Sequence, residues 1–326
     1  MIEKFEAFIS KHDSFVISTH DPADADGLGA ELTIALILQE RKKKFRIINA
    51  SPISSNYIFM DPSGIIEQYN ETGQGMLPES TVLVLVDTAD VNNMGCMREA
   101  ALRSKEIFYI DHHEPKPDSD LSGIADPSAA STCEMAVELA HAAGVPFNLQ
   151  TAIAAYAGIV YDTGFFAYSK TGPRAFKAAL SLLDAGVDPS AVYHDLCESS
   201  PTGTLLLQKK SLDSLAFHCR GRVASQVLRK EDFTETDTQL ENSEGFVNIP
   251  LKSKDILVSI MIKESPEGKV RCSMRSKGMI NVAKIAQDFG GGGHVNASGF
   301  KRDRDINKTL AVTLEKISEI LVGHET

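Results

Sequence analysis

The 326-residue sequence has no tryptophan and only five cysteines, which are scattered along the chain. No two cysteines have C-x-x-C spacing, so neither a zinc ribbon nor a disulfide framework is expected. The sequence also lacks an apolar stretch of about 18 residues and a basic-then-apolar N-terminal segment. We therefore expect a cytoplasmic protein with no membrane partner.

Positive charge is scarce, because 33 Lys and Arg residues face 44 Asp and Glu residues, for a net charge of -11. Residues 216–326 hold 17 Lys and Arg against 15 Asp and Glu, which leaves 16 against 29 for residues 1–215. A net-acidic chain is poorly suited to hold long duplex DNA through its overall field. A locally basic site for a short anion remains compatible with this charge, and the acidic half offers carboxylates for cations.

The chain is long enough for two hydrophobic cores. Residues 1–198 alternate short apolar runs with helical patterns, which predicts an α/β domain with a doubly wound parallel sheet. Residues 199–214 are predicted to be a linker, and residues 215–326 a smaller α+β domain. We expect strands at 14–19, 45–48, 81–86, 106–110, 222–228, 256–262 and 269–275, and helices at 30–44, 131–144, 149–161, 173–185 and 282–289.

Carboxylates and imidazoles follow three of the predicted strands. Because parallel strands present their carboxyl ends at one edge of a sheet, we expect these side chains to converge there. An alternative for the first motif is an acidic surface loop in which an Asp caps the following helix. The residues concerned are His20, Asp24 and Asp26 after the first strand, Asp87 after 81–86, and Asp111, His112 and His113 after 106–110, with Asp162 at the end of a predicted helix.

Such crowded carboxylates repel and raise one another's pKa, a cost that two divalent metal ions would remove. Nitrogen and oxygen ligands without thiolate indicate Mn²⁺, with Mg²⁺ or Co²⁺ as alternatives. A second locus is the run Gly290-Gly-Gly-Gly293-His294, which Arg271, Arg275 and Lys277 precede. Successive glycines let backbone N–H groups face an anion, so this run predicts a phosphate cradle, with a flexible turn as the alternative.

Together these motifs resemble those of the DHH phosphoesterase superfamily, named for the run seen here as Asp111-His112-His113. His20…Asp24-Ala-Asp26 is similar to its first motif, Asp87 to its second, and Asp162-Thr-Gly to its fourth. Residues 244–250, Arg275-Ser-Lys277 and 290–294 are similar to the first type of DHH-associated domain. Total length and both halves resemble most the nanoRNase/pAp-phosphatase (NrnA-like) branch.

The resemblance implies an active site in the cleft between the two domains. His20 and Asp24 would bind one metal ion, Asp26, His112 and Asp162 the other, and Asp87 would bridge them. It further implies that His113 contacts the scissile phosphate, with Asp111 orienting its neighbours, and that Arg275, Gly291, Gly292, Gly293 and His294 hold a second phosphate or sugar. Asp21-Pro22-Ala23 departs from relatives that place Asn-Pro directly before the first acid, but the spacing from His20 to Asp24 is kept.

The activity implied by the resemblance is hydrolysis of phosphoric esters by water that two metal ions activate. Its substrates would be short oligonucleotides, cleaved as by an exonuclease, and 3′-phosphoadenosine 5′-phosphate. A pyrophosphatase or exopolyphosphatase and a cyclic-dinucleotide phosphodiesterase share the metal half and remain alternatives. A non-catalytic nucleotide sensor is a further alternative, although every motif acid and histidine is present. The sequence leaves a homodimer open.

Overall fold

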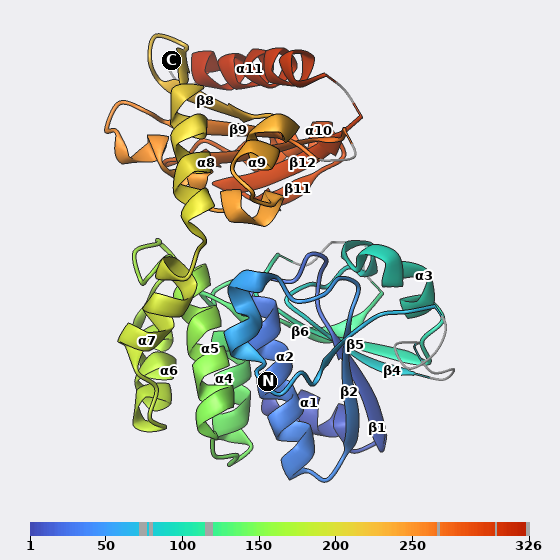
Figure 1. Ribbon diagram of the computed structural model, residues 1–326. Coiled ribbons are helices and arrows are strands. Elements are labelled where there is room, and N and C mark those ends of the chain that lie inside the picture. The colour runs from blue at the N-terminus through green and yellow to red at the C-terminus, as the bar shows by residue number, and fades with distance from the viewer. Residues whose placement is uncertain (72–76, 78–80, 115–119, 266–267, 304, 324–326) are drawn as a thin grey trace. The chain divides into compact units, whose positions relative to one another are not determined.

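The computed structural model describes residues 1–71, 77, 81–114, 120–265, 268–303 and 305–323. The chain divides into two compact units, Met1–Ser199 and Ser200–Thr326 (Figure 1). Each unit has its own sheet and its own hydrophobic core. Among the described residues, no helix is both long and apolar enough to cross a membrane.

The first unit is built on a six-stranded sheet with the order β3-β2-β1-β4-β5-β6, and every neighbouring pair is parallel. The chain starts in the middle, runs to one edge and then crosses to the other, which confirms the predicted doubly wound α/β fold. The strands are β1 (Ser14–Ser18), β2 (Lys44–Asn49), β3 (Ile66–Gln68), β4 (Val82–Val86), β5 (Glu106–Asp111) and β6 (Ser122–Ala125).

Helices cover both faces of this sheet (Figure 1). The larger core lies on one face beneath α1 (Ile2–Ile9), α2 (Ala25–Glu40), α4 (Thr132–Ala142), α5 (Leu149–Asp162) and α6 (Pro173–Asp184). The 3₁₀ helix η1 (Ser55–Met60) packs with them, and α7 (Pro189–Tyr193) and the π-helix η4 (His194–Glu198) follow α6. On the other face lie η2 (Val91–Asn93), η3 (Gly95–Met97) and α3 (Arg98–Ala101).

Helix α2 begins five residues earlier than the helix predicted over 30–44, and it ends at Glu40. Two glycines near its start indicate a loop, but here they allow close packing. A Cβ at Gly29 would lie 2.5 Å from the backbone oxygen of Ala154 on α5. The expected basic last turn is not helical, because Lys44 already begins β2.

The second unit holds a six-stranded sheet with the order β11-β12-β10-β9-β8-β7, in which only β8 and β9 are parallel. The strands are β7 (Ala216–His218), β8 (Val223–Leu228), β9 (Val258–Glu264), β10 (Val270–Ser276), β11 (Gly292–His294) and β12 (Ala297–Arg302). Helices α10 (Val282–Asp288) and α11 (Ile306–Gly323) pack on one face.

The segment expected as a linker, 199–214, is largely the helix α8 (Thr202–Asp213), which belongs to the second unit. Its Leu207 is completely buried in a small cluster on the second face of the sheet. Next to α8 along this face are α9 (Lys230–Glu235) and the 3₁₀ helices η5 (Leu240–Ser243), η6 (Phe246–Asn248) and η7 (Pro250–Lys252).

Candidate active site

Three adjacent strands of the first sheet end in side chains that converge on Asp87. His20 follows β1, Asp87 follows β4, and Asp111 is the last residue of β5. The backbone of Asp87 has a φ of 58°, and its N–H donates to the carbonyl of Ile110 on β5 at 2.9 Å. Non-glycine residues are uncommon in this left-handed region, and those that do occur there are often found at functional sites.

The Asp87 carboxylate is buried and lies close to three imidazoles. Its Oδ2 is 3.3 Å from His20 Nε2, and its Oδ1 is 3.6 Å from His112 Nε2 and 3.7 Å from His113 Nδ1. The hydroxyl of Thr132, at the first turn of α4, donates to Oδ1 at 2.9 Å. Asp87 is therefore the residue through which the strand ends are connected.

The structure brings together three sets of residues whose ligand atoms lie within 4.8 Å of one another. They are His20 with Asp24 and Asp87, Asp26 with His112 and Asp162, and Asp87 with His112 and His113. The first two sets hold all the residues that the family resemblance named as metal ligands. Carboxylate oxygen with imidazole nitrogen is a donor set suited to divalent Mn, Mg, Co or Zn, so the residues present fit a pair of such ions.

Burial and like charge set the protonation of the carboxylates. Burial, together with the neighbouring Asp87, raises the pKa of both Asp26 and Asp162 well above the ordinary range. Burial would also raise the pKa of Asp24, but the imidazole of His20 and two backbone N–H groups hold it below its usual value. Divalent cations would offset the repulsion among these groups.

Helix α4 holds Asp26 in place through its first turn. The N–H of Thr132 donates to Asp26 Oδ2 at 2.6 Å, and the N–H of Cys133 donates to Oδ1 at 2.8 Å. The preceding Ser131 caps the helix by accepting from the N–H of Glu134 at 3.0 Å. Thr132 is a site residue that no motif in the sequence singles out. The pattern Ser131-Thr-Cys-Glu134 is an N-terminal capping signature that marks where this helix begins.

The first motif combines both of the interpretations that the sequence left open. Asp24 caps α2, since its Oδ1 accepts the N–H groups of Asp26 at 3.0 Å and Gly27 at 3.1 Å. The same oxygen is 3.7 Å from His20 Nε2. Burial would lower the pKa of His20, but Asp24 and Asp87 raise it well above the ordinary value.

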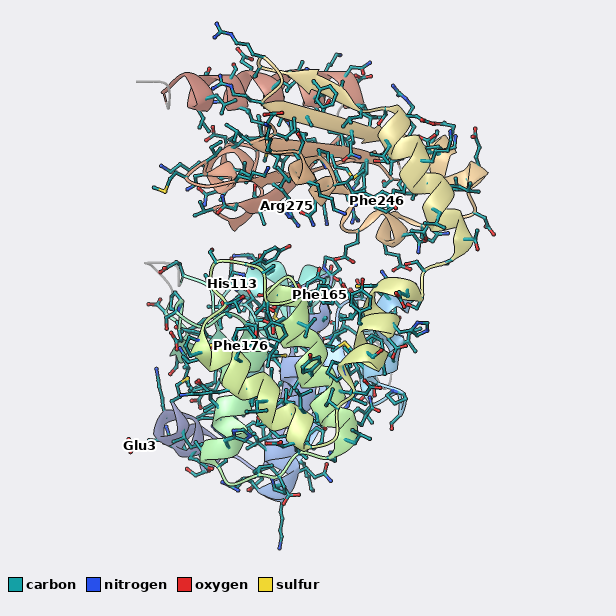
Figure 2. The ribbon with its side chains drawn as sticks, turned by 90° about the vertical axis from the view of Figure 1, so that its left-hand side faces the viewer. Glu3, His113, Phe165, Phe176, Phe246 and Arg275 are labelled. Atoms are coloured by element: carbon teal, nitrogen blue, oxygen red, sulfur yellow. The ribbon has the colours of Figure 1, made fainter. Side chains whose placement is uncertain are left out.

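His113 is paired with the last residue of its own strand. Its Nδ1 is 2.7 Å from Asp111 Oδ1, and its backbone N–H donates to the same oxygen at 3.0 Å. Burial would lower the pKa of His113, but Asp111 and Asp87 raise it. The His113 side chain is 36% exposed, against 3% for His112. The His113 side chain is therefore open to solvent. Figure 2 shows His113 at one end of the first unit.

For the glycine run of the second unit the sequence predicts a phosphate cradle, with a flexible turn as the alternative, and the structure shows that the run is partly strand. Its last two glycines and His294 form β11, which pairs with β12. Only Gly290 and Gly293 have positive φ, and a Cβ at Gly291 would lie 2.1 Å from the oxygen of Gly299. At Gly292 a Cβ would meet open space. The side chain of His294 lies outside the described part of the chain.

Three cations are expected near the glycine run. One of them, Lys277, makes a hydrogen bond outside the run, since its Nζ donates to the carbonyl of Ser253 at 2.6 Å. Arg275 is half-buried on β10, and its Nη1 donates to the carbonyl of Met274 at 3.0 Å. Figure 2 shows Arg275 on the side of the second unit away from α11. The predicted location of the active site between the domains stays a prediction.

Two family models match the chain. The DHH family N-terminal domain matches residues 14–161, and the DHHA1 domain matches residues 222–321. These two ranges contain every predicted site residue except Asp162, which directly follows the first range.

The chain is similar to proteins of known name and structure. It is 28% identical to the bifunctional oligoribonuclease and PAP phosphatase NrnA of Thermus thermophilus over 94% of this chain and 89% of that protein. It is 27% identical to the cyclic-di-AMP phosphodiesterase GdpP of Geobacillus thermodenitrificans over 97% of this chain but 49% of that protein. The structure of an exopolyphosphatase-related protein from Bacteroides fragilis matches with a TM-score of 0.87 at 26% identity, covering 98% of this chain and 97% of that one.

Proposed function

Since the chain belongs to the DHH family and carries a DHHA1 domain, we propose that it is a metal-dependent phosphoesterase that hydrolyses short oligoribonucleotides and 3′-phosphoadenosine 5′-phosphate. The observation that carries this proposal is that the set of His20, Asp24 and Asp87 lies next to the set of Asp26, His112 and Asp162, with His112 Nε2 of the second set 3.6 Å from Asp87 Oδ1 of the first. The similarity to an oligoribonuclease and PAP phosphatase over nearly the whole length of both proteins supports the choice of substrates.

In this proposal His20 and Asp24 would hold one ion, Asp26, His112 and Asp162 would hold the other, and Asp87 would contribute to both. Mn²⁺ is the proposed metal. When bound, the ions supply an activated water and stabilise charge on the attacking and leaving oxygens. Because Asp26 and Asp162 have raised pKa values, acid opposes metal binding by protonating them.

His113 would donate the proton that the leaving oxygen needs. Its raised pKa keeps more of it protonated near neutral pH than an ordinary histidine. Asp111 holds Nδ1, which leaves Nε2 to face the phosphate. Arg275, Gly292 and the other residues of the glycine run would hold a further phosphate of the substrate in the second unit.

The family resemblance leaves other phosphoesters open, and two comparisons bear on them. One relative is named a cyclic-di-AMP phosphodiesterase, and one structural match is titled exopolyphosphatase-related. The test is turnover of pApA, a five-nucleotide RNA, 3′-phosphoadenosine 5′-phosphate, cyclic di-AMP and pyrophosphate, each with Mn²⁺ and with chelator. We expect metal-dependent release of mononucleotide from the first three. Pyrophosphate as the sole substrate would overturn the proposal.

The bridging role is tested with Asp87→Asn, which removes one charge from the group between both ligand sets. We expect kcat/KM to fall by more than ~100-fold while the fold is kept, because both ions lose a ligand. Circular dichroism checks the fold, and Asp184→Asn on the exposed end of α6 is the matched control. Hydrolysis by Asp87→Asn at the rate of the control would refute the role.

A further inference from the structure

The second sheet turns its two faces to different surroundings. On β10, Val270, Cys272 and Met274 are buried in the core formed with α10 and α11. Since side chains alternate along a strand, Arg271 and Arg275 lie on the opposite face, where they are half-buried. This opposite face is the one that carries polar and charged side chains.

Helices cover part of this opposite face. Over β8 and β9, Leu228 and Met261 pack with Leu207, Phe233 and Phe246, which come from α8, α9 and η6. The residues that continue the face on β10 and β12 are more open: among them Ser273 and Gly299 are half-buried and Lys301 is exposed. Ser273 and Gly299 stand opposite each other and are both small, so few side-chain atoms cover this part of the sheet.

Three cations stand side by side across this face. Arg271 is directly opposite Lys263 on β9 and directly opposite Lys301 on β12. We call Lys263, Arg271 and Lys301 the basic row. Directly opposed residues have Cβ atoms ~5 Å apart, and like charges in such pairs destabilise a sheet. An anion bound across the row would remove this repulsion.

The charge around Lys263 shows the same imbalance. The pKa of Lys263 is lowered to about 8, chiefly by burial, with Arg271 and Arg275 adding to the lowering and Glu244 opposing it. The charges that act on this lysine include one carboxylate and two guanidinium groups, an imbalance that a ligand with negative charge would offset.

The member of the basic row on β10, Arg271, is on the same strand as Arg275, the predicted phosphate contact. Arg271 and Arg275 are four residues apart on one face of the strand, which is ~13 Å at 3.3 Å per residue. This span is wider than the separation of the two phosphates that flank one nucleotide, which a single sugar joins. A substrate phosphate at Arg275 and one at Arg271 would thus belong to different nucleotides.

We propose that the basic row is a second anion site that binds a backbone phosphate of an oligonucleotide, beyond the nucleotide held at Arg275. This inference rests on the proposed function and adds a determinant of substrate length to it. Oligonucleotides of several units reach the row, whereas 3′-phosphoadenosine 5′-phosphate does not. The row therefore raises the affinity for longer substrates and leaves the smallest one unaffected.

The test compares Arg271→Ala/Lys301→Ala with Lys284→Ala/Lys308→Ala, a control that removes the same charge from exposed positions on α10 and α11. Lys263 is kept because it is half-buried, so its removal would also change the packing. We expect kcat/KM for a five-nucleotide RNA to fall at least ~10-fold, as for the loss of one charge-assisted hydrogen bond. Turnover of 3′-phosphoadenosine 5′-phosphate stays within ~2-fold. The single variant Arg271→Lys, in which Lys301 is unchanged, keeps the charge of the row, and we expect it to retain most of the activity on the RNA.

A binding measurement separates this inference from the proposed function. Fluorescence anisotropy of a labelled five-nucleotide RNA, in chelator, gives the affinity of the full chain at several salt concentrations. We expect the salt slope to fall by ~0.7 in the Arg271→Ala/Lys301→Ala variant, as for one lost phosphate contact on a single strand.

An unchanged slope, or equal losses for the RNA and the bisphosphate, would overturn the role of the row. Equal losses in the control variant would overturn it too, because they would show an effect of overall charge. A wild-type chain that hydrolyses no nucleotide would refute the proposed function, while the anisotropy result would still decide the role of the row.

Discussion

Glu31 is a completely buried carboxyl group on α2. Its Oε2 accepts from Asn49 Nδ2 at 2.9 Å, and Asn49 Oδ1 in turn accepts from the hydroxyl of Ser18 at 3.3 Å and the N–H of Thr19 at 3.4 Å. This chain of hydrogen bonds reaches the residue next to His20. Glu31 is thus connected through Asn49 to the end of β1, which precedes the candidate metal ligand His20.

Burial raises the pKa of Glu31 to about 8 from 4.5. The folded chain therefore keeps a proton that the unfolded chain loses above pH 4.5, and the free energy of unfolding falls as pH rises from 4.5 to about 8. The contribution of Glu31 to this fall is at most ~1.4 kcal/mol per pH unit. We expect Glu31→Gln to lack it, so its stability relative to wild type rises with pH.

Urea unfolding at several pH values, with chelator present, measures this difference. Glu40→Gln, at the exposed end of the same helix, is the control and should run parallel to wild type. If the curves of Glu31→Gln and wild type were parallel, the buried carboxyl would be ionised in the folded chain as in the unfolded chain.

Single residues were predictable where a motif carried them. Asp87 and His112 could be named from the sequence because each directly follows an apolar strand. Glu31 and Thr132 could not, because nothing local distinguishes a buried Glu in a helix from an exposed one. Their roles depend on contacts with residues far apart in the sequence, such as the bond from Thr132 to Asp87.

At the scale of elements, the glycine run allows a test of which of its glycines the packing of β11 requires. Gly291 has no room for a side chain beside Gly299 and Phe300, whereas Gly292 is open. We expect Gly291→Ala to destabilise the second unit by ~1–3 kcal/mol, as overpacking does, and Gly292→Ala to stay within ~0.5 kcal/mol. Urea unfolding of the full chain provides the measurement. Equal stability of the two variants would show that β11 shifts freely away from β12.

Elements were predictable in proportion to how strongly their own residues favour them. The apolar run of β4 and the helical pattern of α5 were found at nearly the observed positions. β11 was missed because glycine disfavours strands, and only its pairing with β12 fixes it there. The start of α2 was missed for a similar reason, since its glycines gain from tight packing against α5.

At the scale of the whole molecule, two separate cores predict separate responses to metal. The ligand sets lie in the first unit alone. At Mn²⁺ concentrations ~100 times Kd, ligand binding adds ~2.7 kcal/mol to a folded domain. That corresponds to a rise in Tm of ~5–10 °C for a domain of this size, and we expect it in one calorimetric transition only.

Differential scanning calorimetry with Mn²⁺ and with chelator measures the shift, and Asp87→Asn should abolish it. Equal shifts of every transition in the wild-type chain would contradict metal binding confined to the first unit.

The two-part organisation was visible in the sequence because charge and pattern both change along the chain. The doubly wound fold followed from alternating strands and helices, and the structure confirms it. The extent of the second unit was harder to predict. Helix α8 offers a weak periodic pattern, with Leu205 and Leu206 exposed and Leu207 buried, so only its packing in the second unit places it there.

The two amide protons that α4 points at Asp26 offer a way to watch this centre without any substrate. Because each one donates to a different oxygen of the same carboxylate, a proton or a cation arriving there withdraws electron density from both bonds. The NMR resonances of Thr132 and Cys133 would then move together, so that ¹⁵N-labelled protein reports directly on the occupancy of a site deep inside the first unit.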